Sequence, residues 1–222
     1  MLRFLILKLD GPMQAWGGHT FEDYRPSHLF PTRSGLLGLL GSCLGLERQD
    51  SRGLEHLSNS LEFAVRADEQ DGEDAPSKRA LKLPDFHTVL NARKVDGSVS
   101  KNRVVSRREY LFDAVFTIAV GERAGAMVKL DVIAQAVRRP CYTPFLGRRS
   151  CPIARPLFEG WCEAEDGVNA LKKVPPVRGV IYGEGEAVAN SRPMSIRDVP
   201  QHGRYRRFGT RFVYVHADEG GN

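Results

Sequence analysis

The chain has 222 residues, of which 41% are hydrophobic and 27% charged, and its formal net charge is +5. This composition suits a soluble globular protein with one main domain and a smaller appendage, and it excludes extensive disorder. No apolar stretch approaches the ~20 residues of a membrane-spanning helix, and residues 1–10 lack the pattern of a signal peptide. We therefore expect a cytoplasmic protein with no membrane partner.

The four cysteines, at positions 43, 141, 151 and 162, form no CxxC pair and have no histidine at zinc-finger spacing. Free thiols in a reducing compartment are expected rather than a metal site. The GxxxxGKS or GxxxxGKT loop of nucleotide hydrolases is absent from the sequence. The sequence thus predicts no metal and no other cofactor.

Positive charge is concentrated in three segments. Residues 78–108 hold nine basic residues and two acids, residues 132–158 hold five arginines and no acid, and residues 192–211 hold six arginines and one acid. Residues 47–74, in contrast, carry nine acids and three bases. One basic segment alone would indicate a solvated surface, but three together favour a polyanionic partner such as nucleic acid.

The first predicted element is a strand over residues 2–9, whose apolar side chains on both faces suit a central position in a sheet. Residues 11–31 follow as a loop. A helix opens at residues 31–34, capped by Thr32 or Ser34, and Gly45 ends it. Glycines at positions 35, 38 and 41 predict close approach of the helix backbone, either to the sheet, which is favoured, or to a ligand.

The remaining predicted strands and helix complete the element order of a known domain type. The predicted elements are strands over 61–66, 112–120 and 160–164 and a helix over 127–137. Strand, helix, strand, strand, helix, strand is the order of a ferredoxin-like, RRM-related α+β domain. Further strands over 177–182 and 211–216 predict a smaller C-terminal β-rich portion. We therefore expect a domain of residues 1–165 and an appendage of residues 166–222.

The basic segment 78–108 is an insertion in this order. Asp96-Gly97 predicts a two-residue type I′ turn, so that residues 89–95 and 99–105 pair as a hairpin. The segment contains few large apolar side chains, so the hairpin is expected to project as an arm that a polyanion orders. A mobile surface loop is the alternative.

Two stretches near the N-terminus carry candidate binding residues. Gln14 and Trp16 follow the first strand, and the indole would either stack on a base or cap the core. Arg25, Arg33 and Ser34 precede or open the first helix, whose N-terminal amides favour phosphate.

The densest candidate is the segment 142–150, which interleaves aromatic rings, a glycine and paired arginines without an acid. Its proline and glycine argue against a helix and predict a shaped loop. Tyr142, Gly147, Arg148 and Arg149 would combine base stacking with phosphate contacts, as RNA recognition often does. A connector with solvated arginines is the alternative.

Histidines at positions 19, 28, 87 and 202 are the available general acid–base residues. Metal-independent RNA cleavage needs a base near the ribose 2′-hydroxyl and an acid near the leaving oxygen. The spacing pairs no two of these histidines, so no catalytic residue is predicted.

Three motifs together resemble the CasD family, the type I-E CRISPR Cascade subunits of the RAMP superfamily. They are LDGPMQAWG at residues 9–17, FPTRSGLLGLLG at residues 30–41 and YTPFLGRRSCP at residues 142–152. The resemblance implies a ferredoxin-like domain with an extended β-hairpin thumb, and the basic arm matches that thumb in position and character. A glycine-rich loop found near the C-terminus of many RAMP proteins is reduced here to Gly183-Glu184-Gly185, so no C-terminal RNA contact is carried over.

The resemblance also implies partners. They are the 5′ handle of the guide RNA (crRNA), the backbone subunit CasC, the large subunit CasA and, indirectly through guide pairing, target DNA. Arg108 stands where the thumb returns to the domain and is expected to contact RNA, while Lys101 and Arg103 would clamp or kink the strand. The sequence therefore predicts a non-enzymatic RNA-binding subunit that caps the backbone filament. A metal-independent endoribonuclease that cuts CRISPR repeats is the first alternative, and a generic single-strand binder is the second.

Overall fold

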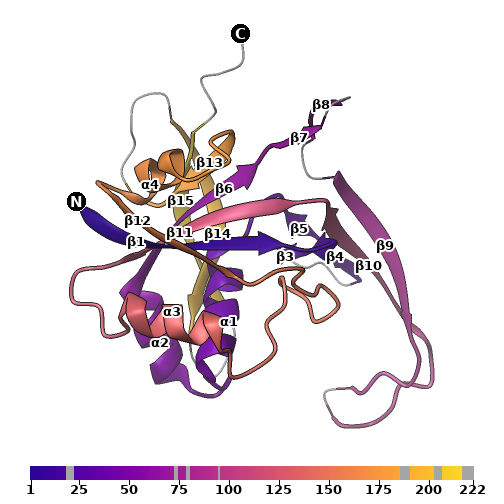
Figure 1. The fold of residues 1–222 in the computed structure, drawn as a ribbon. Coiled ribbons are helices and arrows are strands. Elements are labelled where there is room, and N and C mark those ends of the chain that lie inside the picture. The colour runs from indigo at the N-terminus through magenta and orange to yellow at the C-terminus, as the bar shows by residue number, and fades with distance from the viewer. Residues whose placement is uncertain are drawn as a thin grey trace.

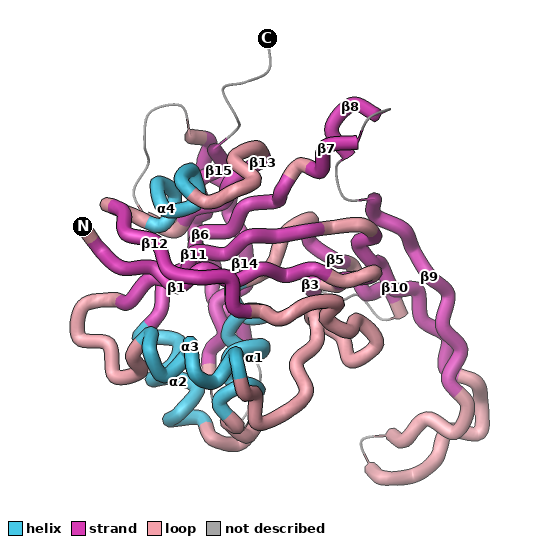
Figure 2. Tube along the Cα trace, in the orientation of Figure 1, coloured by secondary structure: helices cyan, strands magenta, loops and turns pink. Residues whose placement is uncertain are grey.

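The computed structural model describes residues 1–18, 23–72, 75–78, 81–94, 96–185, 191–202 and 207–216. Its largest unit is a seven-stranded antiparallel sheet (Figures 1 and 2). In spatial order the strands are β12 (Phe158–Ala164), β1 (Leu2–Asp10), β11 (Val115–Glu122), β6 (Leu61–Asp68), β13 (Gly179–Gly183), β15 (Arg207–His216) and β14 (Arg192–Gln201).

Helices cover both faces of this sheet. α1 (Arg33–Leu44), α2 (Ser51–Ser60) and α3 (Leu130–Arg138) lie on one face, and α4 (Gly167–Lys173) lies on the other (Figure 1). On β1, leucines 5, 7 and 9 enter the larger core, whereas Phe4 and Ile6 enter the smaller core beneath α4. The prediction of a central strand covered on both sides is therefore confirmed. Among the described residues, no helix has the length and apolar character needed to cross a membrane.

Helix α1 begins and ends as predicted. The Thr32 side chain accepts a hydrogen bond from the Gly35 amide, and Gly45 closes the helix with φ of 78°. Helix α2 was not predicted, although its signal was present. Asp50 caps it by accepting a hydrogen bond from the Gly53 amide at 2.8 Å, and Leu57 anchors it in the core.

The fold is mixed α/β with mostly antiparallel sheets and four helices within the described residues. The predicted strands at residues 61–66 and 160–164 and the predicted helix at residues 127–137 correspond to β6, β12 and α3. The C-terminal strands continue the same sheet, because β13 pairs with β6 and β15 pairs with β13. A domain boundary near residue 165 stays a prediction.

The basic insertion forms a hairpin of β9 (Leu81–Val89) and β10 (Val104–Phe112), which projects from the body (Figure 1). The predicted strand bounds were too close to the tip, where Arg93 and Val99 form an isolated bridge. The predicted type I′ turn was also wrong. In the described part of the turn only Gly97 has positive φ, and Asp96 instead caps the turn by accepting from the Ser98 amide at 2.9 Å. Arg79 and Val95 lie outside the described residues.

Short strands attach the hairpin to the body. β10 pairs with β2 (Met13–Gln14) and, in parallel, with β4 (Tyr24–Arg25). β3 (Trp16–Gly17) pairs with β5 (Ser27–His28), and β7 (Gln70–Gly72) pairs with β8 (Ala75–Lys78). The segment after β1 thus lies against the base of the hairpin.

Candidate nucleic-acid interface

Three of the predicted RNA-binding arginines, from distant parts of the chain, meet at the base of the hairpin. Arg25 of β4 is the register partner of Arg108 in β10. Arg148 Nη2 donates to the Arg25 carbonyl at 3.0 Å, and its Nη1 donates to the Glu109 carbonyl at 3.1 Å. The guanidinium of Arg148 lies 4.7 Å from the ring centre of Tyr110. Since Arg25 is exposed and Arg108 is half-buried, a strand that crosses this base would meet both.

The carboxylate of Glu109 lies within this cluster and is neutralised there. It is within 2.6 Å of Lys82 Nζ and accepts from the Ser27 amide at 2.9 Å and from the Tyr24 hydroxyl. Burial works to raise the pKa of Glu109, but the hydrogen bonds from Lys82 and Tyr24 outweigh it and hold the pKa below its usual value. Because Lys82 balances the negative charge of Glu109, this carboxylate does not cancel the positive charge of the arginines, which can attract a polyanion.

The segment 142–150 is the predicted shaped loop, and it reaches from the end of α1 to the hairpin base. The Tyr142 amide donates to the Ser42 carbonyl at 3.2 Å, while Tyr142 as a whole is 47% exposed. Gly147 has φ of +85°, and a Cβ there would lie 1.8 Å from the Ala15 carbonyl oxygen. Gly147 therefore lets the loop pack on β2 and β3, while Arg149 is exposed to solvent.

Gln14 and Trp16 require a correction. Both are 0% exposed, and Trp16 Nε1 donates to Gln14 Oε1 at 3.1 Å. The Gln14 amide nitrogen donates in turn to the Ala114 carbonyl at 2.7 Å. Their predicted contact with RNA is therefore wrong, and the core alternative for Trp16 is right. A Cβ at Gly35 would approach this indole to 2.8 Å, so Gly35 packs closely as predicted, whereas Gly38 has open space.

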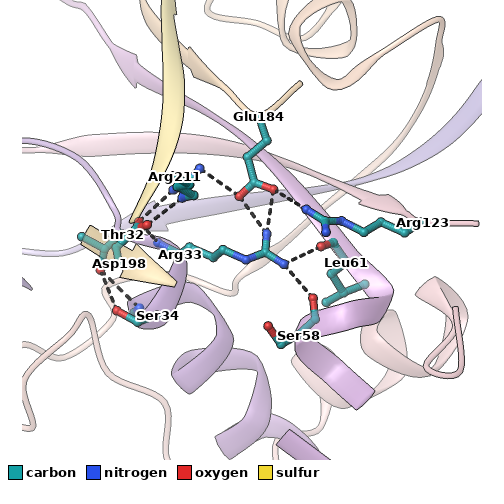
Figure 3. A network of polar contacts seen from close by, with 10 residues as sticks. Thr32, Arg33, Ser34, Ser58, Leu61, Arg123, Glu184, Asp198 and Arg211 are labelled. Atoms are coloured by element: carbon teal, nitrogen blue, oxygen red, sulfur yellow. Dashed lines mark hydrogen bonds and ion pairs between the residues drawn. The ribbon is translucent and has the colours of Figure 1, made fainter. Parts of the chain in front are cut away.

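The predicted phosphate site at the start of α1 is also wrong. The Arg33 amide donates to Asp198 Oδ2 at 2.7 Å, so a protein carboxylate already occupies this helix terminus. The Arg33 guanidinium is buried and donates to Glu184 at 2.6 Å and to the carbonyls of Ser58 and Leu61 at 2.6 Å and 2.9 Å (Figure 3).

Ser34, the other residue predicted at this terminus, is half-buried, and its hydroxyl lies 3.4 Å from that of Thr32. It therefore belongs to the capped end of the helix rather than to an open anion site.

Two further arginines complete the buried network. Arg211 lies 2.6 Å from Asp198 and 3.1 Å from Glu184, and Arg123 lies 3.1 Å from Glu184 (Figure 3). Glu184 was not predicted as a partner, although it stands in the reduced glycine loop Gly183-Glu184-Gly185. The network joins α1, the loop after β13 and the β14–β15 ribbon.

The arm beyond the hairpin base is exposed. Lys101 and Arg103 lie near the tip and are open to solvent, as an arm that contacts RNA requires. The expectation of few large apolar side chains was wrong, because several stand exposed along the hairpin. They are Leu81, Leu83, Phe86, Val89, Leu90, Val99, Val104 and Val105. Exposed apolar side chains gathered on one element are typical of an interaction surface.

The histidines divide by environment. His28 is half-buried, and burial lowers its pKa. His87 Nε2 lies 2.8 Å from Asp85 and 3.2 Å from the Tyr110 hydroxyl, which places a histidine–tyrosine pair at the hairpin base. His19 lies outside the described residues.

Comparisons with known proteins agree with the motifs. The family model of the CRISPR-associated protein (Cas_Cas5) matches residues 4–214. The chain is 47% identical over 216 residues to the CRISPR system Cascade subunit CasD of Escherichia coli (strain K12), a match that covers 97% of this chain and 96% of the relative.

Two solved structures share the fold. A chain of a CRISPR RNA-guided surveillance complex has a TM-score of 0.74 at 28% identity, with 96% of this chain and 89% of that chain covered. A solved Cas protein has a TM-score of 0.66 at 27% identity, with 96% and 93% covered. The resemblance inferred from the three motifs is confirmed, and the chain belongs to the Cas5 family of CRISPR-associated proteins.

Proposed function

We propose that this chain is a non-catalytic subunit of a type I-E CRISPR Cascade complex and holds the 5′ handle of the guide RNA. The observation that carries the proposal is the meeting of Arg25, Arg108 and Arg148 at the base of the projecting hairpin, around a neutralised carboxylate. The identity to CasD supports the complex, because that relative is named as a Cascade subunit.

The body that presents this site has the strand order β12-β1-β11-β6, with chain order β1, α1, β6, β11, α3, β12. This arrangement supports a ferredoxin-like, RRM-related domain, in which α2 is an added helix. The hairpin is the thumb of that domain.

The role proposed for each residue follows from how exposed its side chain is. The guanidiniums of Arg25, Arg108 and Arg149 bind phosphates, and the exposed ring of Tyr142 stacks on or walls in a handle base. Both Nη atoms of Arg148 donate to backbone carbonyls, those of Glu109 and Arg25, so Arg148 positions the strands that carry Arg25 and Arg108. Lys101 and Arg103 near the tip clamp the strand.

The exposed surface of the hairpin also bears on which protein subunits bind this chain. The exposed apolar side chains of the hairpin suit a protein neighbour, which we assign to the backbone subunit CasC, with CasA as the second neighbour. The chain caps the backbone filament in the bacterial cytoplasm, where it engages target DNA only through guide pairing.

The double variant Arg25→Ala/Arg108→Ala is expected to bind labelled 5′ handle at least about tenfold more weakly at low salt, because it loses two charge-assisted contacts. The slope of log K against log salt should fall by roughly 1.4, since each single-strand phosphate contact contributes about 0.7. Fluorescence anisotropy across a salt series measures both quantities.

Arg52→Ala on α2 is the matched control, because Arg52 is an exposed arginine outside the hairpin sheet. An unchanged affinity and slope in the double variant would refute the site. Equal affinity for handle and scrambled RNA would instead favour a generic single-strand binder.

The endoribonuclease alternative rests on His87, which lies between Asp85 and the Tyr110 hydroxyl. The proposal predicts that purified protein leaves labelled repeat RNA intact on a denaturing gel in EDTA. Specific cleavage that His87→Ala abolishes would overturn the non-catalytic assignment, whereas intact RNA with both proteins supports it.

A further inference from the structure

We infer that the β14–β15 ribbon forms a second surface for single-stranded nucleic acid, separate from the hairpin. The ribbon is the last pair of strands at one end of the seven-stranded sheet. One of its faces packs on the body, because Ile196 and Val213 enter the larger core. The hairpin strand β10 belongs to a different sheet, so binding at one surface does not require the other.

The opposite face of the ribbon presents aromatic rings. Phe212 is 62% exposed and Phe208 is 36% exposed. Residues two apart on a strand share a face, so Phe208, Thr210 and Phe212 point the same way. The register places Arg197 opposite Thr210, between the two rings, and Arg197 Nε donates to the Phe208 carbonyl at 2.9 Å.

The ribbon as a whole is positively charged. The described ribbon carries four arginines and one carboxylate, Asp198. That carboxylate is buried and is already bound by Arg211 at 2.6 Å and by the Arg33 amide at 2.7 Å. Arg192, Arg197 and Arg207 are exposed, and strand alternation puts Arg197 on the face of the two rings, whereas Arg192 and Arg207 lie at strand ends on the other face. The described ribbon thus presents guanidiniums to solvent without a free carboxylate.

A hollow of ≈ 310 Å³ lies beside Phe212 and extends the surface. It is lined by Arg33, Ser58, Asn59, Arg123, Glu184, Gly185, Val199, Arg211 and Phe212. The only carboxylate in this lining, Glu184, already pairs with three arginines (Figure 3). The Arg123 side chain is 44% exposed at the edge of this hollow.

Two exposed rings with the Arg197 guanidinium between them are a combination that binds single strands, because bases stack on aromatic faces and phosphates bind arginine. An acidic protein surface would match the arginines but would leave the two separated phenylalanine rings in contact with water or polar groups. The observations therefore favour a nucleic-acid strand over a protein.

The test uses the full chain and 15-nucleotide oligomers of uridine and of 2′-deoxyuridine, which share the base and the phosphates but differ in the 2′-hydroxyl. Ultraviolet crosslinking followed by mass spectrometry maps the contacted peptides. In the hairpin variant Arg25→Ala/Arg108→Ala, which lacks two phosphate contacts of the proposed handle site, we expect crosslinks within residues 207–216 to persist. Phe208→Leu/Phe212→Leu, which keeps apolar side chains, should remove these crosslinks and weaken the residual affinity by about tenfold.

Arg52→Ala serves again as the exposed-arginine control and should change neither readout. The inference is overturned if wild-type protein gives no crosslink in residues 192–216, or if Phe208→Leu/Phe212→Leu leaves crosslinks and affinity unchanged. If the hairpin variant loses all binding, the ribbon surface fails while the handle proposal stands. If the ribbon crosslinks persist but the wild type binds handle and scrambled RNA equally in the anisotropy series above, the handle proposal fails and the ribbon surface stands.

Discussion

Replacing Glu184 with alanine is expected to lower the free energy of unfolding by about 3–5 kcal/mol, because removal of one partner leaves buried charge uncompensated. Glu184 lies 2.6 Å from Arg33 and 3.1 Å from both Arg123 and Arg211. The Arg33 and Glu184 side chains are only 4% and 10% exposed, so the lost carboxylate leaves the Arg33 guanidinium largely shielded from solvent. Burial already lowers the pKa of Arg33, and Glu184 opposes that shift.

Urea unfolding followed by circular dichroism measures this loss. Glu159→Ala is the matched control, because Glu159 pairs with Arg155 at an exposed i,i+4 position and should cost no more than about 0.5 kcal/mol. The double variant Arg33→Met/Glu184→Ala should be more stable than Glu184→Ala alone, since it removes the orphaned guanidinium. A loss below about 1 kcal/mol for Glu184→Ala would show that the network is hydrated rather than buried.

The sequence predicted elements well where a local pattern determines them. β1 is apolar on both faces and is buried on both faces, and Thr32 and Gly45 bound α1 because capping chemistry is local. Helix α2 was missed because its polar surface outweighed two leucines in the pattern. The hairpin was expected from Asp96-Gly97, but its ladder lies farther from the tip, where β10 gains β2 and β4 as additional partners.

The site was harder to predict because its contacts are non-local. Arg33 meets Glu184 across 151 positions, so the motif that contains Arg33 gave no sign that its guanidinium is already paired. Trp16 could serve as a stacking platform or as a core residue, and only the position of α1 decides between them. In contrast, Arg25, Arg108 and Arg148 were each chosen for charge, yet a parallel strand pairing and two carbonyl contacts bring them together.

Gly147→Val is expected to destabilise the chain by roughly 3 kcal/mol or more and to weaken handle binding at the same time. Two costs combine, a branched residue at positive φ and overlap with a backbone atom. Gly147 has φ of +85°, and its added Cβ would lie 1.8 Å from the Ala15 carbonyl oxygen. Relief of this overlap must move the loop or the β2–β3 segment, because neither atom belongs to a flexible side chain.

Gly125→Val separates the two costs. Gly125 has φ of +74° but no heavy atom within 4 Å of an added Cβ, so its replacement carries the backbone strain alone, about 1–3 kcal/mol. Thermal and urea unfolding of both variants should therefore show a larger loss for Gly147→Val. Equal losses would mean that the loop adjusts freely around Ala15.

Handle affinity tests whether this loop positions the arginines. Because Arg148 follows Gly147 directly and donates to the Arg25 and Glu109 carbonyls, movement of the loop should break both contacts. Affinity is measured at a temperature where each variant is fully folded, so that instability does not contribute. Gly125→Val should then bind the handle like wild type, and Gly147→Val should bind as weakly as Arg148→Ala. Wild-type affinity in folded Gly147→Val would show that the arginines at the hairpin base do not depend on the loop for their placement.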